Sequence, residues 1–215
     1  MSDRTTFQQA VAEAVASFPA NAMCRRLDAG DFAMQDYRRL LRTLFHQTFE
    51  GPATFALAGF HCPLRHEAAR AYLMKHAEEE KHHYEWLISD LRNVGDDGPD
   101  PRSTFPGPAT AAYVAFNVYC ALREPVARLA IAAVLEGIGG RHGTTYGRRL
   151  ATTLGLTRAQ ASFFLSHGEL DVGHVEEVLA TIDACDLGPR DWAFMAHAAR
   201  TAGALYNGMY DEAAS

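Results

Sequence analysis

Three potential metal ligands occur close together in the segment HGELDVGH. His167, Asp171 and His174 are separated by four and then three residues, so on a helix they lie within about 60° of one another on three successive turns. The apolar residues that share this side of the helix are Phe163, Phe164, Val178 and Ile182. A helix cap or a hydrogen-bonded core histidine would explain only one of the three polar residues, so the pattern predicts a buried metal site rather than packing.

A second set of ligand-type residues occurs in the segment HAEEEKHH. On a helix, Glu80 lies in the middle of an apolar stripe, whereas its two glutamate neighbours point away from that stripe. The residues of the stripe are Leu73, Ala77, Tyr84, Leu87 and Leu91. His76 and His83 flank the same side, and Glu80 and His83 form a Glu-x-x-His element. The alternative is a solvated run of charges, but the central position of Glu80 favours a buried carboxylate that binds a metal.

Glu136 is a third candidate, because the run around it, LAIAAVLEGIGGRHG, is otherwise apolar or small. Four glycines follow it, at positions 137, 139, 140 and 143, and each costs about 1 kcal/mol in a helix relative to alanine. Either another helix packs very closely here or space is left for a ligand, and the sequence leaves both explanations open. His142 points about 120° away from Glu136, so it is expected at the surface or beside the site.

Together these residues form a set of three carboxylates and three imidazoles from three helices. The predicted metal ligands are Glu80, His83, Glu136, His167, Asp171 and His174. Helical bundles that bind two iron or two manganese ions use this combination, including a Glu-x-x-His element. Carboxylate and imidazole suit iron or manganese better than a structural zinc site, and six ligands leave positions at two metals for O2 and a substrate. A redox-inactive hydrolytic centre on the same ligands is the alternative.

The elements that must position these residues are all predicted to be helices, since strand-like alternation and hairpin turns are absent from the sequence. The expected helices span residues 3–18, 31–49 with a continuation over 53–60, 63–94, 109–122, 125–154, 157–185 and 189–210. Residues 95–108 form the clear loop. Short connections and the lack of internal repeats predict an all-α fold, a single seven-helix up-and-down bundle in one domain over residues 1–215.

Composition excludes several classes of protein. The chain has 215 residues and a formal net charge of −6, and its scattered basic residues argue against binding to nucleic acid. No apolar stretch approaches the roughly 18 residues that span a membrane, and residues 1–18 do not form a secretory signal. The four cysteines are far apart and include no CxxC pair, which indicates a reducing compartment. We therefore expect a cytoplasmic soluble protein.

Three segments, in order, resemble the haem-oxygenase-like di-iron oxidases, a family related to the TenA and PqqC proteins. They are HAEEEKHHYEWLISDL, the LEGIGGRHG helix and FLSHGELDVGHVEEVL, and the His-x3-Asp-x2-His element of the last segment is the most specific part. The resemblance implies a seven-helix haem-oxygenase-like bundle with a non-haem di-iron site that activates O2. It also implies that the six residues above are the ligands, with Glu80 and Asp171 expected to act in catalysis.

One position departs from the pattern of some family members. These members carry a glutamate seven residues before the histidine of the corresponding helix, and in this chain that position is occupied by His76. His76 and Glu79 therefore stay open as substitutes for Glu80 beside His83.

The resemblance further implies oxidation of a small amino-acid-like or fatty-acid-like molecule. Reactions of the family are N-oxygenation, C–C bond cleavage and decarboxylation, often in natural-product biosynthesis. Two Fe(II)/Fe(III) ions would be the cofactor, with manganese as the alternative, O2 as cosubstrate and an external electron donor as a potential partner. A substrate carboxylate would find a bidentate partner in Arg123, Arg141, Arg148 or Arg149, although solvation at the surface explains each of them as well. A homodimer through an exposed apolar face is also compatible with the bundle.

Other functions stay open as alternatives. A TenA-like hydrolase needs a nucleophilic cysteine beside a base, and Cys120 lies in an apolar segment with no evident base. A metal-free PqqC-like oxidase would use the histidines without metal, and a haem oxygenase would need an early ligand such as His46, which leaves Glu80 and Asp171 unexplained. A non-catalytic helical interaction protein predicts no buried carboxylates.

Overall fold

The computed structural model describes residues 3–215, except for the side chains of residues 167–172. Every regular element of this described part is helical, without a strand, which confirms the predicted all-α fold. The α-helices are α1 (Asp3–Ser17), α2 (Ala22–Ala29), α3 (Met34–His61), α4 (Glu67–Glu80), α5 (Tyr84–Asn93), α6 (Pro108–Arg123), α7 (Ala127–Ile138), α8 (Thr144–Leu154), α9 (Ser162–Asp183) and α10 (Pro189–Ala213). A π-helical turn, η4 (Gly139–Gly143), joins α7 to α8. None of the described helices is both long and apolar enough to cross a bilayer.

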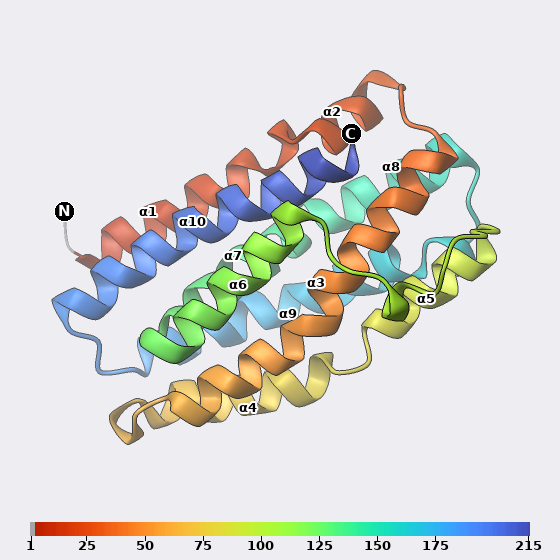
Figure 1. Cartoon of the computed structure of the whole chain (residues 1–215). Coiled ribbons are helices and arrows are strands. Elements are labelled where there is room, and N and C mark those ends of the chain that lie inside the picture. Colours follow the sequence, from red (N-terminus) through yellow and green to blue (C-terminus); the bar gives the residue numbers. More distant parts are fainter. Residues whose placement is uncertain (1–2) are drawn as a thin grey trace.

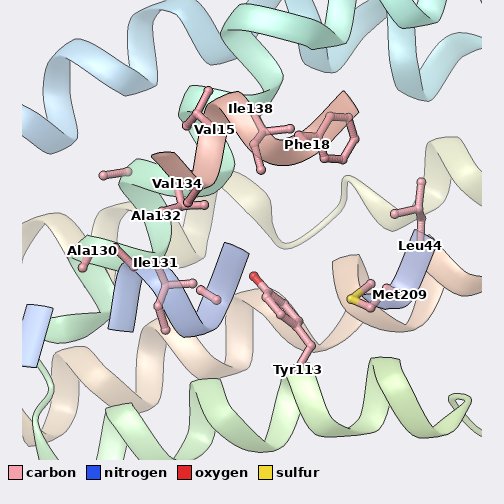
Figure 2. Packing of buried hydrophobic residues seen from close by; sticks show 14 of the residues in the cluster. Val15, Phe18, Leu44, Tyr113, Ala130, Ile131, Ala132, Val134, Ile138 and Met209 are labelled. Carbon is pink, nitrogen blue, oxygen red and sulfur yellow. The ribbon is translucent and has the colours of Figure 1, made fainter. Parts of the chain in front are cut away.

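Helix α7 is the most enclosed element of the bundle. Residues 126–134 are all buried, and the helix contacts α1, α6, α9 and α10. Figure 2 shows Ile138, at the end of this helix, close to Val15 and Phe18 of the N-terminal segment. A helix that is apolar on all sides is typical of the centre of a large bundle, so a charged side chain on α7 is enclosed by protein.

Helices α1 and α10 lie side by side and run in the same direction (Figure 1). The rings of Phe7 and Trp192 are 5.7 Å apart, and farther along the pair Gly203 packs against Ala14. Helix α3 packs along α4 and α6. The first and last helices thus form one wall of the bundle, and α3 and its neighbours form another.

The structure contains more α-helices than the seven predicted. The short helix α2 was not predicted, and the Asn21 side chain caps it by accepting a hydrogen bond from the Cys24 N–H at 2.8 Å. The prediction of one continuous helix over residues 63–94 is wrong, because α4 ends at Glu80 and α5 begins at Tyr84. Helix α3, by contrast, continues past the predicted stop at residues 51–52 and contains Pro52 in its interior.

The turn between α4 and α5 falls within the segment HAEEEKHH. The His83 N–H donates to the Glu80 carbonyl at 3.1 Å, and His83 Nδ1 lies 2.6 Å from Oε2 of the Glu80 carboxylate. Residues 78–80 place three glutamates in the last turn of α4, where their charges oppose the negative end of the helix dipole. Helix α4 ends at this electrostatically unfavourable turn. Residues 73–91 therefore do not share the single continuous face that the sequence predicted.

The prediction of one helix over residues 125–154 is also wrong, since η4 separates α7 from α8. Glycine has a low α-helix propensity. A glycine-rich segment therefore loses little stability when the regular α-helix widens into a π-helical turn. The glycines of this segment serve both expected purposes, close helix packing and space for a ligand. A Cβ at Gly137 would lie 2.8 Å from Cγ2 of Val15, whereas Gly139 and Gly143 line a cavity.

The start of α9 is held by a buried carboxylate from α5. Asp90 accepts hydrogen bonds from the N–H groups of Ser162 and Phe163, both at 2.9 Å, and from the Ser162 hydroxyl at 2.6 Å. Burial raises the pKa of Asp90 despite these hydrogen bonds. This contact fixes the N-terminus of α9 relative to α5, and thereby the position of the helix that carries His174.

We expect Gly203→Ala to destabilise the protein and Gly208→Ala to stabilise it. A Cβ at position 203 would lie 2.6 Å from Cβ of Ala14 and 3.3 Å from its Cα, whereas a Cβ at position 208 meets nothing within 4 Å. The first change should cost about 1–3 kcal/mol of unfolding free energy by overpacking, and the second should gain about 0.5–1 kcal/mol of helix propensity. Urea denaturation measures both, and equal stability of the two variants would contradict the close packing of α1 on α10.

We expect Asp90→Ala to lower the unfolding free energy by about 1–3 kcal/mol, because it leaves the capped N–H groups of α9 without an acceptor. The matched control is Asp97→Ala at an exposed position, which should change stability by less than about 0.5 kcal/mol. Denaturant titration of both variants gives the comparison. A loss at Asp90 no larger than at Asp97 would show that the carboxylate does not anchor α9.

Candidate metal centre

Glu136 lies between two imidazoles that come from different helices. Nε2 of His76 on α4 is 3.3 Å from Oε1 of Glu136 on α7, and Nδ1 of His174 on α9 is 3.4 Å from Oε2. One ligand atom from each of the three residues lies within 4.8 Å of the other two. His76 and Glu136 are buried and His174 is half-buried, so three helices bring two nitrogen donors and a carboxylate together in the protein interior.

The spacing of these donor atoms fits coordination of a metal ion. Imidazole nitrogens and carboxylate oxygens bind transition-metal ions at about 2.1 Å. Two ligand atoms that subtend 90–110° at the ion are then about 3.0–3.4 Å apart. Among the described residues, neither ring nitrogen of the buried His76 makes a hydrogen bond of good geometry, although Nε2 lies 3.3 Å from Glu136 and Nδ1 lies 3.8 Å from Glu79. Because a buried imidazole normally finds a partner for its polar atoms, His76 fits the role of a metal ligand.

The same surroundings keep Glu136 ionised. Burial alone would raise the pKa of this carboxyl group, but the imidazoles of His174 and His76 outweigh burial and hold the pKa well below its usual range. Glu136 is therefore present as a carboxylate, the form that binds a cation.

Aromatic rings fix the orientation of His76. The ring of Tyr72 stacks on it at 5.2 Å with an interplanar angle of 14°, and Phe55 of α3 meets it edge-on at 4.5 Å. The His174 ring also meets it edge-on at 5.0 Å. Packing thus fixes the plane of the His76 ring, with Nε2 facing Glu136.

Glu80 and His83 form a pair of their own at the turn after α4. The two side chains are 12% and 13% exposed, with 2.6 Å between Glu80 Oε2 and His83 Nδ1, and the His83 ring stacks on Trp86 at 4.5 Å. Glu80 lines the same cavity as His76 and Glu136. Neither Glu80 nor His83 belongs to the three-residue cluster found among the described residues.

The other predicted ligands divide into two groups. The side chains of His167 and Asp171 lie outside the described residues, so their participation stays a prediction. Glu79, one of the two substitutes for Glu80, is partly exposed, pairs with Lys75 at 3.4 Å and places Oε2 3.8 Å from Nδ1 of His76. His76, the other substitute, is the residue that faces Glu136 and His174. The sequence placed His76 only at the flank of an apolar stripe, and its signal was its position four residues before Glu80.

A cavity of about 1120 Å³, its open mouth included, reaches the cluster. His76, Glu80 and Glu136 line one part of it. Most other lining residues are apolar or aromatic, among them Phe18, Met23, Leu27, Phe163, Tyr206 and Tyr210. A mostly apolar cavity with a few convergent polar groups is the usual form of a small-molecule site. The three-residue cluster therefore lies where a bound small molecule would reach it.

Two further residues lie at the cavity: Arg128, which the sequence did not identify, and His142, which it expected at the surface or beside the site. Arg128 of α7 lines it and is 2% exposed, whereas the four arginines considered for substrate binding, at positions 123, 141, 148 and 149, are exposed. His142 lines the cavity too, with Nε2 3.0 Å from the Val15 carbonyl, so it borders the cavity rather than the outer surface. Its pKa is lowered by burial.

Solved structures share this fold. A domain of unknown function with a haem-oxygenase-like fold from Shewanella denitrificans is 23% identical, with a TM-score of 0.87 over 99% of this chain and 92% of that one. A haem oxygenase from the cyanobacterium Synechocystis, in complex with haem, is 14% identical, with a TM-score of 0.74 over 99% and 92%. A TenA family transcription regulator from Silicibacter is 16% identical, with a TM-score of 0.73 over 98% and 96%. At these identities the likeness shows the fold alone.

No curated protein matches the chain. A family model described as an iron-containing redox enzyme matches residues 38–207, a stretch that contains His76, Glu136 and His174 and most of the helical bundle. The chain therefore belongs to this family of iron-containing redox enzymes and has its haem-oxygenase-like, all-helical fold.

Proposed function

We propose that this protein is a non-haem di-iron oxidase that uses O2 to oxidise a small amino-acid-like or fatty-acid-like molecule. The observation that carries the proposal is the buried carboxylate of Glu136, which lies 3.3 and 3.4 Å from two imidazoles beside an apolar cavity. Membership of an iron-containing redox family supports iron as the metal, and a nitrogen and oxygen donor set without thiolate suits iron or manganese.

Two groups of residues would hold the two ions. His76, Glu136 and His174 supply one group, in the arrangement described above. The second group consists of Glu80 and His83, which we propose to act together with His167 and Asp171, two further ligands that the sequence predicts. His76 is thus an additional ligand rather than a replacement for Glu80. Reduced iron bound in this way would supply the electrons for the activation of O2.

The residues of the chain itself have three tasks in this reaction. The apolar walls of the cavity bind the substrate body and exclude water from the oxidising centre. Phe55 and Tyr72 fix the His76 ring. The contact of 2.6 Å between Glu80 Oε2 and His83 Nδ1 orients these two side chains relative to each other.

The rival functions lack a supporting contact among the described residues. Burial raises the pKa of Cys120 to about 12 and that of Cys24, which lines the cavity, to about 11. A nucleophilic cysteine requires a lowered pKa, so neither residue favours a TenA-like hydrolase. His46, the candidate haem ligand, places Nε2 3.1 Å from the Thr104 hydroxyl and is not among the residues that line the cavity.

Loading with Fe(II) under anaerobic conditions tests the proposal. Wild-type protein should bind about two iron ions per chain and change its visible absorption when air is admitted. His76→Ala should lose roughly half of the iron or more, because it removes a buried nitrogen donor. His82→Ala is the matched control, since His82 belongs to the same segment but its side chain is 65% exposed. Absence of iron uptake by wild-type protein, or equal iron in both variants, would refute the proposal.

The pair Glu80 and His83 should contribute to the second iron alone. Glu80→Gln keeps the shape of the side chain but removes its charge, so we expect the iron content to fall from about two ions per chain to about one. His83→Ala should give the same result, and Glu85→Gln, an exposed change in the same region, should leave the content unchanged. Full loading of both the Glu80 and the His83 variants would show that this pair does not bind metal.

A further inference from the structure

Arg128 is a buried cation without a charged partner among the described residues. Arg128 is one of the largest residues whose side chain is fully buried, and only 2% of its surface is exposed. Nε donates to the Thr54 hydroxyl at 3.2 Å, the guanidinium carbon lies 3.6 Å above the ring centroid of Phe55, and the buried Nη1 has no hydrogen-bond partner. Burial lowers the pKa of this group, which reflects the cost of enclosing its charge.

Such an arrangement is unfavourable unless something further binds to it. A buried charge normally has an ion-pair partner of opposite sign, and a cation–π contact with Phe55 replaces only part of the lost hydration. A guanidinium also offers parallel N–H donors that match a carboxylate geometrically. The missing partner thus has the chemistry of a planar oxyanion.

The position of Arg128 places such an anion inside the proposed active site. Arg128 lines the same cavity as Glu136 and His76. The ring of Phe55 contacts both the guanidinium group, 3.6 Å away, and the His76 ring, 4.5 Å away, so the guanidinium carbon is at most about 8 Å from the centre of the His76 ring. Of the residues lining the cavity, Arg128 is the sole arginine or lysine.

We propose that Arg128 binds the carboxylate of the substrate, and that the substrate is a monocarboxylate with an apolar body that occupies the aromatic part of the cavity. This inference rests on the proposed function and narrows its substrate class. The walls beyond Arg128 include Phe18, Leu27 and Phe163 and, among the described residues, no second arginine or lysine. The second carboxylate of a dicarboxylate would therefore lack a basic side chain as its partner. One end of the substrate is recognised by charge, and the rest by apolar contact.

Binding of matched ligands to metal-free, full-length protein tests the proposal. The probes are octanoate against octanol and phenylacetate against phenylethanol, each titrated by calorimetry after iron has been removed with a chelator. For at least one pair, wild-type protein should bind the carboxylate about ten-fold or more tightly than the alcohol, as expected for a hydrogen-bonded charge pair. Absence of this preference in both pairs would overturn the proposal.

Three variants assign the preference to Arg128. Arg128→Met, of similar length and without charge, should bind each acid and alcohol equally, and Arg128→Lys should keep part of the preference. Arg102→Met, an exposed arginine paired with Asp100, should behave as wild type. The melting temperature of Arg128→Met should not fall, because the change removes an uncompensated buried charge. A preserved carboxylate preference in that variant, with or without a loss of stability, would show that Arg128 has a structural role only.

These measurements test the carboxylate-binding proposal and the di-iron proposal separately. Arg128→Met should load the same amount of Fe(II) as wild-type protein, because Arg128 is not a metal ligand. Lack of iron uptake by wild-type protein contradicts the di-iron proposal, whereas a missing carboxylate preference in protein that loads iron contradicts the role of Arg128. If Arg128→Met does not fold, a larger rise in the melting temperature of wild-type protein with octanoate than with octanol supports the proposal, and equal rises overturn it.

Discussion

The burial of Glu136 in the middle of the bundle is the constraint on which the rest of the structure depends. An ionised carboxylate on a helix enclosed by protein is tolerated only with compensating positive charge or hydrogen-bond donors. His76 and His174 provide that compensation from α4 and α9, so these two helices must approach α7 from different directions. Asp90, by capping the start of α9 from α5, ties the second of them to the remainder of the fold.

Interruptions of regular helices border the cavity beside this carboxylate. Pro52 lies within α3, Glu80 ends α4, and Gly139 and Gly143 belong to the π-helical turn after α7; all four residues line the cavity. A continuous helix would project a regular series of side chains into this space, whereas a proline, a helix end and a wide glycine turn remove or redirect them. The irregular backbone is therefore concentrated where the bundle must stay open.

The sequence predicts the parts of this arrangement that depend on local spacing. The all-α class followed from helical periodicity and turn residues, and Glu136 and His174 were recognised because each is a ligand-type residue on an otherwise apolar face. His76 was placed beside rather than in the centre because the layout assumed one helix over residues 63–94, and the break at Lys81–His83 depends on how α4 and α5 pack, which periodicity does not contain. Arg128 was not recognised, since an arginine at the start of an apolar run is normally solvated. Its burial follows from the enclosure of α7 by several distant segments.

Arg128 and Glu136 carry opposite charges on the same buried helix, yet they do not pair with each other. They are eight residues apart, so about two helical turns separate their backbones. The guanidinium group contacts the Phe55 ring, whereas the carboxylate faces the His76 imidazole, which itself contacts Phe55. A direct ion pair would satisfy both groups and leave nothing for a ligand to recognise. Their separation keeps a negative site for a cation and a positive site for an anion within one apolar cavity, and each would be stabilised most when its ligand is bound. Under the proposed function, this separation brings a metal centre and the charged end of its substrate into the same water-poor space without letting either neutralise the other.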